Sequence, residues 1–188
     1  MNDQKNRVCP VEMANSLDSR IRRWLQNPRT ILAPYVKKGW TVLDVGCGPG
    51  FFSIELADLV GSTGRVIAAD LQQGMLERLS EKIRGTELER RVKLVKCENN
   101  SINVSESVDF ILTFYMVHEV PDKDRFFKQL NAVLRDQGQY LLVEPKLFHV
   151  SKEEFFSTLK LAEQNGFEVH PGPKLLLSWS AVLKKRMN

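Results

Sequence analysis

Three glycines at alternating positions, Gly46, Gly48 and Gly50, separate two segments of different preference. The β-rich run 41–45 precedes them, and the helix-compatible run 51–60 follows them. Glycine has no Cβ, so the backbone can turn sharply and a ligand can come close to the N–H groups at the helix start. A strand, a glycine turn and a helix in this order are typical of the opening of an α/β nucleotide site. The alternative is a tight strand-to-helix turn that binds nothing.

Two aspartates accompany the glycine turn. Asp44 stands two residues before the first glycine, and the loop reads G-x-G-x-G where a dinucleotide fingerprint reads G-x-G-x-x-G. A carboxylate here would repel a pyrophosphate, whereas it suits a ligand that carries an ammonium group. Asp70 ends the predicted strand 65–70, and in doubly wound folds an acid at this place hydrogen-bonds ribose hydroxyls. Asp70 is also a favourable helix N-cap, and the two roles are compatible.

The remaining pattern predicts a Rossmann-like α/β fold. The run 108–114 is almost continuously apolar, as expected of a parallel strand that is buried on both faces. Two strands within 167–183 are joined by a Pro-Gly-Pro link that is too short for a crossover helix, so they must be antiparallel. We therefore predict a seven-stranded, mostly parallel sheet with an antiparallel C-terminal hairpin and helices on both faces. The other predicted strands are 41–45, 65–70, 92–96 and 139–144, and the helices are 51–60, 74–83, 124–134 and 151–165, the last with a capping box of Ser151 and Glu154.

The segment before the first strand has a different character. Apolar residues at 17, 21, 24 and 25 have helical spacing, and Pro28 is well placed to begin a second helix over 28–37. We expect residues 1–38 to form a helical cover over a core of residues 39–188, within a single domain. The cover contributes to a substrate pocket or simply packs on the core.

The segment Asp44–Gly50 resembles the first motif of the class I S-adenosylmethionine-dependent methyltransferases. The order of the predicted elements and the terminal hairpin resemble that family as well. The resemblance implies S-adenosylmethionine as cofactor and S-adenosylhomocysteine as product, with an adenine contact in the segment after strand 92–96. The cofactor-binding residues that it implies are Asp44, Gly46, Cys47, Gly48, Pro49, Gly50, Asp70, Leu71, Cys97, Glu98 and Thr113.

Candidate catalytic side chains follow the fourth and fifth predicted strands. Open α/β sheets bind ligands at the carboxyl ends of their strands, which is where Tyr115, His118 and Glu144 are expected. His118 is in a turn that resembles the family's fourth motif, and an imidazole can accept a proton near neutral pH. We expect His118 to orient the acceptor or take its proton, with Glu119 or Glu144 orienting the ring. The alternatives are a structural histidine and a glutamate paired with a nearby base.

These features predict methyl transfer to a small molecule by in-line displacement. A sulfonium donor is already activated by its charge, so alignment of the acceptor and exclusion of water are the main tasks of the protein. The chain is similar to the branch that includes ubiquinone and menaquinone C-methyltransferases and arsenite methyltransferases. Arsenite chemistry needs clustered thiols, whereas Cys47 is in the glycine loop and Cys9 is in a polar segment. The alternative function is a catalytically silent sensor or scaffold that binds S-adenosylmethionine; a nucleotide-dependent oxidoreductase is disfavoured by Asp44 and by the hairpin.

The composition of the chain limits the classes of partner that we expect. The formal charge of +4 and a pI near 9.0 are mild, and the basic groups 20–23 and 184–186 are too short for a nucleic-acid stripe, so no nucleic acid is expected. The three cysteines are far apart, which predicts neither a disulfide framework nor a metal site. No apolar run reaches the length of a membrane span, and the N-terminus is polar, so a cytoplasmic protein is expected. A second copy of the chain, in a homodimer, is a further candidate partner.

Overall fold

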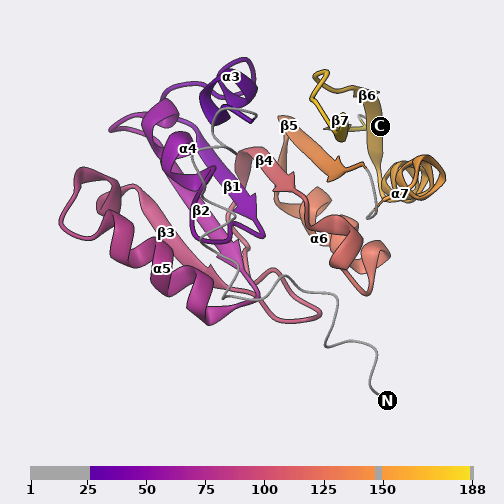
Figure 1. Ribbon diagram of the computed structural model, residues 1–188. Helices are drawn as coiled ribbons and strands as arrows, with labels where there is room; N and C mark the ends of the chain where they lie inside the picture. The colour runs from indigo at the N-terminus through magenta and orange to yellow at the C-terminus, as the bar shows by residue number, and fades with distance from the viewer. Residues whose placement is uncertain (1–25, 147–149, 187–188) are drawn as a thin grey trace.

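One seven-stranded sheet organises residues 26–146 and 150–186, the part of the chain that this computed structural model describes (Figure 1). The strand order is β3-β2-β1-β4-β5-β7-β6, in which the first five strands are parallel and β7 is antiparallel to both β5 and β6. The predicted parallel sheet with an antiparallel C-terminal hairpin is thus confirmed. The strands are β1 (Thr41–Val45), β2 (Arg65–Asp70), β3 (Val92–Lys96), β4 (Val108–Phe114), β5 (Leu134–Pro145), β6 (Phe167–Pro171) and β7 (Ser178–Lys185).

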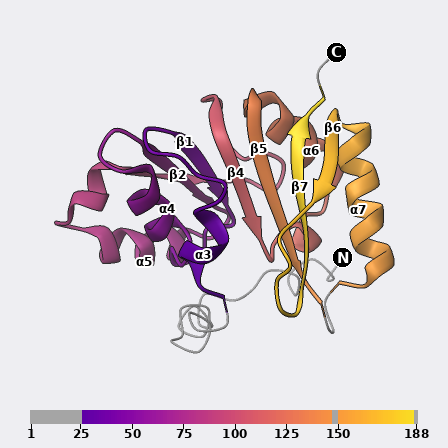
Figure 2. The same ribbon diagram turned by 90° about the horizontal axis from the view of Figure 1, so that it is seen from above.

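Helices cover both faces of this sheet, as predicted, because the strands are apolar on both sides. Alternate residues of the central strands enter two separate cores, so that Val42 lies in one and Leu43 in the other. The core that holds Val42 also contains the apolar faces of α3 (Pro28–Leu32), α4 (Ser53–Val60) and α5 (Gln73–Ile83). The opposite core contains those of α6 (Lys123–Val133) and α7 (Lys152–Gln164). Figure 2 shows α7 beside the β6–β7 hairpin at one end of the sheet.

The chain changes direction in the sheet between β1 and β4. Strands β1, β2 and β3 are laid down toward one edge, and the chain then crosses to the other side of β1 to form β4. Ligands of open α/β sheets bind at such a switch point, outside the carboxyl ends of the strands. The loops after β1, β2, β3 and β4 all emerge at this edge.

The segment before β1 differs from the prediction. The helix expected over 28–37 ends after Leu32, because Pro34 has no N–H to continue the helical hydrogen bonds. Its N-cap Asn27 accepts from the backbone N–H of Thr30, at 3.2 Å. The helix predicted over 16–25 lies outside the described residues. Within those described residues, no helix combines the length and the apolar composition needed to cross a bilayer.

Two predicted boundaries shift for local reasons. β5 begins at Leu134 instead of 139, because Leu134 already pairs with Val108. The pairing is then interrupted by an irregularity and continues from Gln139, which pairs with Phe110. Helix α4 begins at Ser53 instead of 51, because the glycine turn continues through Phe52. The capping box at the start of α7 is confirmed: the Ser151 hydroxyl accepts from the Glu154 N–H, and the Glu154 carboxylate accepts from the Ser151 N–H.

Candidate active site

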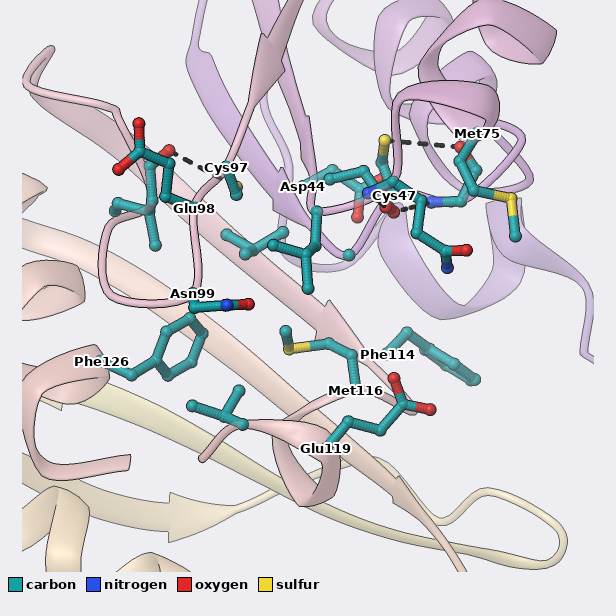
Figure 3. Close-up of a pocket in the computed structure, with 18 of the residues that line it drawn as sticks. Asp44, Cys47, Met75, Cys97, Glu98, Asn99, Phe114, Met116, Glu119 and Phe126 are labelled. Carbon is teal, nitrogen blue, oxygen red and sulfur yellow. Dashed lines mark hydrogen bonds between the residues drawn. The ribbon is translucent and has the colours of Figure 1, made fainter. Parts of the chain in front are cut away.

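A cavity opens at the carboxyl edge of the sheet, where the loops after four parallel strands meet (Figure 3). Its walls are the glycine loop after β1, the segment 70–75 after β2, the segment 97–102 after β3 and the segment 114–122 after β4. Side chains from α6 close it on one side. The cavity therefore lies at the switch point that the topology predicts.

The glycine loop is shaped around this cavity. Gly46 has φ +72°, and a Cβ there would stand 2.8 Å from Cγ of Met116, so a side chain is excluded. Gly48 has φ +53°, yet a Cβ on it would meet no atom of the described residues within 4 Å. Because Gly48 lines the cavity, this open space gives a ligand close access to the loop backbone.

Asp70 ties the glycine loop to the end of β2. Its side chain is 7% exposed; Oδ2 accepts from the Gly48 N–H and Oδ1 from the Gln72 N–H, both at 2.8 Å. Burial raises the pKa of this carboxyl, and the two backbone hydrogen bonds oppose the rise. Each oxygen keeps acceptor capacity, and the residue lines the cavity, so Asp70 is suited to accept from a pair of ligand hydroxyls.

Asp44 and Lys82 brace the two sides of the loop. The Asp44 carboxylate is buried at the end of β1 and accepts from the Ser53 hydroxyl at 2.6 Å. Lys82, from α5, donates to the Pro49 carbonyl at 2.7 Å. A nucleoside with a cationic tail fits this arrangement, because open backbone, a hydroxyl acceptor and a buried carboxylate line one cavity.

Two thiols flank Asp70 on the neighbouring loops. The backbone N–H of Cys47 donates to the Ala69 carbonyl, and that of Cys97 to the Asp70 carbonyl, on the other side of β2. Burial raises the pKa of Cys97 to about 12 and holds that of Cys47 well above its usual range, so both are neutral thiols. Among the described residues, no cluster of three His, Cys, Asp or Glu side chains suits a metal ion.

Four aromatic rings form a continuous wall of the cavity. Phe51 meets Phe52 edge-on at 5.0 Å between ring centroids, Phe52 meets Phe114 at 4.3 Å, and Phe114 meets Tyr115 at 4.5 Å. We call these four residues the aromatic wall. It joins the last residues of the glycine turn, just before α4, to the end of β4, and it offers flat apolar surface to a planar ligand.

Tyr115 holds an unusual backbone conformation at the end of this wall. Its φ of +63° lies in the left-handed region, which costs a bulky residue on the order of 1–3 kcal/mol. Its hydroxyl hydrogen-bonds with the Ser178 hydroxyl and accepts from the Gln26 side chain, both at 2.6 Å. These contacts fix the ring on the cavity edge from β7 and from the segment before α3.

The loop after β3 brings a residue that the sequence analysis did not select. Glu98 lines the cavity, but its carboxylate points away from Met116 in Figure 3, whereas the Asn99 amide extends toward Met116. The Gln129 side chain from α6 holds this loop, since it accepts from the Ile102 N–H and donates to the Asn100 carbonyl, at 3.0 and 3.1 Å.

Four predicted site residues do not line the cavity. The missing Cβ of Gly50 faces Leu79 of α5, at 2.3 Å from its Cδ1, so this glycine serves helix packing. Thr113 is fully buried and shares a 2.8 Å hydrogen bond with the Tyr140 hydroxyl. His118 and Glu144 pair with each other and do not line the cavity. The structure brings the remaining members together on the cavity: Asp44, Gly46, Cys47, Gly48, Pro49, Asp70, Leu71, Cys97, Glu98 and Tyr115.

His118 is directed toward β5 and not toward the cavity. Its Nδ1 lies 2.8 Å from Oε2 of Glu144, and its Nε2 lies 3.9 Å from Oε1 of Glu119. Burial lowers the pKa of His118, but the hydrogen bond and charge of Glu144, together with the charge of Glu119, outweigh burial, so that the pKa is raised overall. Glu119 and Lys123 are the other charged neighbours of His118. The pKa of Glu154 on α7 is lowered mainly by its hydrogen bonds with Ser151, and the charge of His118 adds to this lowering.

This pair predicts a pH-dependent contribution to stability. A raised folded-state pKa means that protonated His118 stabilises the fold fully below its unfolded pKa, about 6.5, and that this contribution is lost as the pH rises through the folded pKa. In urea unfolding experiments, the free energy of unfolding of a His118→Gln variant should therefore fall less steeply than that of the native protein as the pH rises above neutrality. Parallel slopes for His118→Gln and native protein would contradict the pairing.

Several lining residues escaped the sequence analysis because they act through tertiary position. Arg125 and Gln129 were findable in principle, since their spacing of four puts them on one face of α6. The paired aromatics after the glycine loop were a second usable signal. Met116 and Asn99 carried no local signal. The lining residues that were not selected are Val45, Phe51, Phe52, Gln72, Met75, Asn99, Asn100, Ser101, Ile102, Phe114, Met116, Val120, Pro121, Asp122, Arg125, Phe126 and Gln129.

The sheet order, the antiparallel hairpin and a cavity between a glycine loop and the acid of the next strand define the class I methyltransferase fold. Residues 36–181 match the family model described as a methyltransferase domain, and the chain belongs to this family. A solved structure of a SAM-dependent methyltransferase from Aquifex aeolicus superposes with a TM-score of 0.80 at 28% identity, covering 93% of this chain and 99% of that one.

Two curated relatives carry more specific names. The chain is 30% identical over 143 residues to a demethylmenaquinone methyltransferase of Lactobacillus johnsonii, which covers 76% of this chain and 56% of the relative. It is 31% identical over 116 residues to the ubiquinone/menaquinone biosynthesis C-methyltransferase UbiE of Haemophilus ducreyi, covering 61% and 45%. The chain thus spans about half the length of these relatives.

Proposed function

We propose that this protein transfers a methyl group from S-adenosylmethionine to a planar aromatic small molecule of the hydroquinone class. The observation that carries the proposal is the joining of two half-sites in one cavity, the glycine loop with Asp70 and the aromatic wall with Tyr115. The names of the curated relatives, which refer to quinone methylation, agree with an acceptor of this class.

The cofactor half would be held by residues that differ in role. Asp70 would accept from the ribose hydroxyls, the Gly48 backbone would approach the amino-acid portion, and Asn99 would contact the base. Asp44 would stand near the positive groups of the cofactor, where a buried carboxylate is favourable. When bound, S-adenosylmethionine supplies an electrophilic methyl group on a positively charged sulfur.

The acceptor half would be the aromatic wall. Offset or edge-on contacts between aromatic rings favour a flat acceptor by about 0.5–1.5 kcal/mol for each ring pair. Among the described residues, the lining carries five carboxylates and a single Arg or Lys side chain, Arg125, which disfavours an anionic acceptor. A neutral hydroquinone therefore meets both the shape and the charge of this wall.

Methylation of a hydroquinone carbon or oxygen releases one proton. Glu119 lines the cavity, and in this proposal it would receive that proton. His118, which does not line the cavity, would act through Glu119, since its Nε2 lies 3.9 Å from the Glu119 carboxylate. Tyr115 and Glu144 would then position this turn without exchanging a proton themselves.

A methyl-transfer assay tests this function. Radiolabelled S-adenosylmethionine would be incubated with the protein and a panel of acceptors: a dihydroxynaphthalene, a catechol, a primary amine and arsenite. Label is expected in the dihydroxynaphthalene product. Label in none of the acceptors, although the cofactor binds, would refute the hydroquinone assignment, and absence of cofactor binding would refute methyl transfer altogether.

A substitution in the aromatic wall should separate the two half-sites. Phe52→Leu removes a ring contact, and we expect the acceptor KM to rise by roughly 3- to 10-fold with the cofactor Kd unchanged. Phe167→Leu is the control, because Phe167 is equally buried but packs in the opposite core. An unchanged acceptor KM in Phe52→Leu would argue against the wall as the acceptor site.

A further inference from the structure

Glu144 gathers four donors around one buried carboxylate. Its Oε1 accepts from the backbone N–H groups of Met116 and Val117 at 3.2 and 3.0 Å. Its Oε2 accepts from the backbone N–H of His118 at 2.9 Å, and His118 Nδ1 lies 2.8 Å from the same oxygen. Three consecutive amides of the turn after β4 thus converge on a side chain of β5, and this turn contains the short 3-10 helix η3 (Val117–Glu119).

Packing alone does not explain a carboxylate here. Glu144 is 2% exposed, and a charge at such a position is costly unless its oxygens are hydrogen-bonded. An apolar side chain would fill the same space without that cost. The donors identify what the carboxylate provides, which is a fixed position for the turn.

The turn in question touches the glycine loop directly. Met116 fills the space that a Cβ on Gly46 would need, with its Cγ 2.8 Å and its own Cβ 2.9 Å from that point. Met116 and Glu119 both line the cavity, one near the loop and one near the aromatic wall (Figure 3). A shift of the turn would therefore move both half-sites of the cavity together.

The residue before the turn needs such support. Tyr115 has φ +63°, a conformation that persists only where surrounding contacts determine it. Its backbone N–H donates to the carbonyl of Val143 at 2.8 Å, one residue before Glu144 on β5. The end of β5 thus holds the strained residue and the turn that follows it as one unit.

We propose that Glu144 is a positioning residue, which holds the turn after β4 against the glycine loop and so sets cofactor affinity and acceptor alignment without lining the cavity. This inference rests on the proposed methyl transfer. It means that Glu144, which does not line the cavity, couples the cofactor half of the site to the acceptor half.

Hydrogen exchange and cofactor binding test the proposal together. In Glu144→Gln the carboxylate is replaced by an amide of similar size whose NH₂ group faces N–H donors. We expect amide exchange in peptides covering 115–120 to quicken by about tenfold or more, and the Kd of S-adenosylhomocysteine to rise by about tenfold or more. Glu168→Gln, an exposed glutamate of β6, is the matched control and should leave both unchanged. Native exchange and native affinity in a folded Glu144→Gln protein would overturn the proposal.

Two further variants keep the test decisive if Glu144→Gln does not fold. His118→Gln retains the three backbone bonds, so exchange at 116–118 should stay close to the native rate, and a rise of about tenfold there would overturn the anchoring role of Glu144. Met116→Ala removes the contact with Gly46 but not the anchor; without ligand, exchange in peptides covering 46–50 should rise while 117–119 stays protected. Unchanged exchange at 46–50 would overturn the coupling. If native protein bound no S-adenosylhomocysteine, the proposed function would fail, whereas the exchange data would still decide the role of Glu144.

Discussion

An Asp70→Asn protein is expected to bind S-adenosylhomocysteine about 10- to 150-fold more weakly than the native protein, which corresponds to about 1.5–3 kcal/mol for hydrogen bonds to a charged acceptor. The native carboxylate accepts from the Gly48 and Gln72 N–H groups and faces the cavity with its remaining acceptor capacity. The asparagine amide would turn a donor toward one of these N–H groups or toward the ligand. Calorimetric titration measures the change directly.

The control for Asp70 is an aspartate remote from the cavity. Asp136 lies on β5 with its side chain 82% exposed, and it pairs with Lys185 at 3.4 Å. Asp136→Asn should keep native affinity for S-adenosylhomocysteine. A folded Asp70→Asn protein with affinity within about twofold of native would contradict the role of Asp70 as the ribose acceptor.

Three glycine-to-alanine variants should separate the two uses of glycine in this fold. Gly48 and Gly85 both have positive φ, +53° and +71°, and in the part of the chain that the structure describes a Cβ on either would meet no atom within 4 Å. Each variant should therefore lose about 1–2 kcal/mol of unfolding free energy from backbone strain alone. Gly50→Ala has φ +90° and places a Cβ 2.3 Å from Leu79, so overpacking should bring its loss to about 2–5 kcal/mol.

Cofactor affinity should distinguish Gly48→Ala from Gly85→Ala. Gly48 lines the cavity, whereas Gly85 does not, so only Gly48→Ala puts a methyl group where the ligand approaches the loop. We expect S-adenosylhomocysteine to bind Gly48→Ala about tenfold or more weakly, and Gly85→Ala with native affinity. Urea unfolding and calorimetry of the same three proteins provide both measurements. Equal affinities for Gly48→Ala and Gly85→Ala would show that the loop backbone is not part of the cofactor site.

The local features of the chain were readable from the sequence because each depends on neighbouring residues. Alternating glycines predicted the turn after β1, and all three do adopt positive φ. The capping box of Ser151 and Glu154 spans only four positions, so its reciprocal hydrogen bonds form as predicted. The Pro-Gly-Pro link required an antiparallel pair, which is β6 with β7. Asp70 was predicted to be at a strand end, and the end of β2 brings it to the glycine loop.

Side-chain direction in the central strands was not readable in this way. β4 is buried on both faces, so its sequence has no alternation to tell which residues face the site. Thr113 was predicted to bind cofactor, but it belongs to the face that meets Tyr140 in the opposite core. The predicted helix over 28–37 is too long for a simpler reason. Pro34 lacks a backbone N–H, so the helix ends after Leu32.

The sequence by itself determined the family resemblance, the nucleoside loop with its acid and the parallel sheet with its hairpin, because these follow from short-range patterns and chain connectivity. Only the tertiary structure decided that β7 lies between β5 and β6, that His118 turns to Glu144, and that Met116 rests on Gly46. These arrangements bring together segments that are far apart in the sequence, and their relative positions depend on how the whole sheet packs. The position of the turn after β4 is fixed by hydrogen bonds to β5, a strand that comes later in the chain.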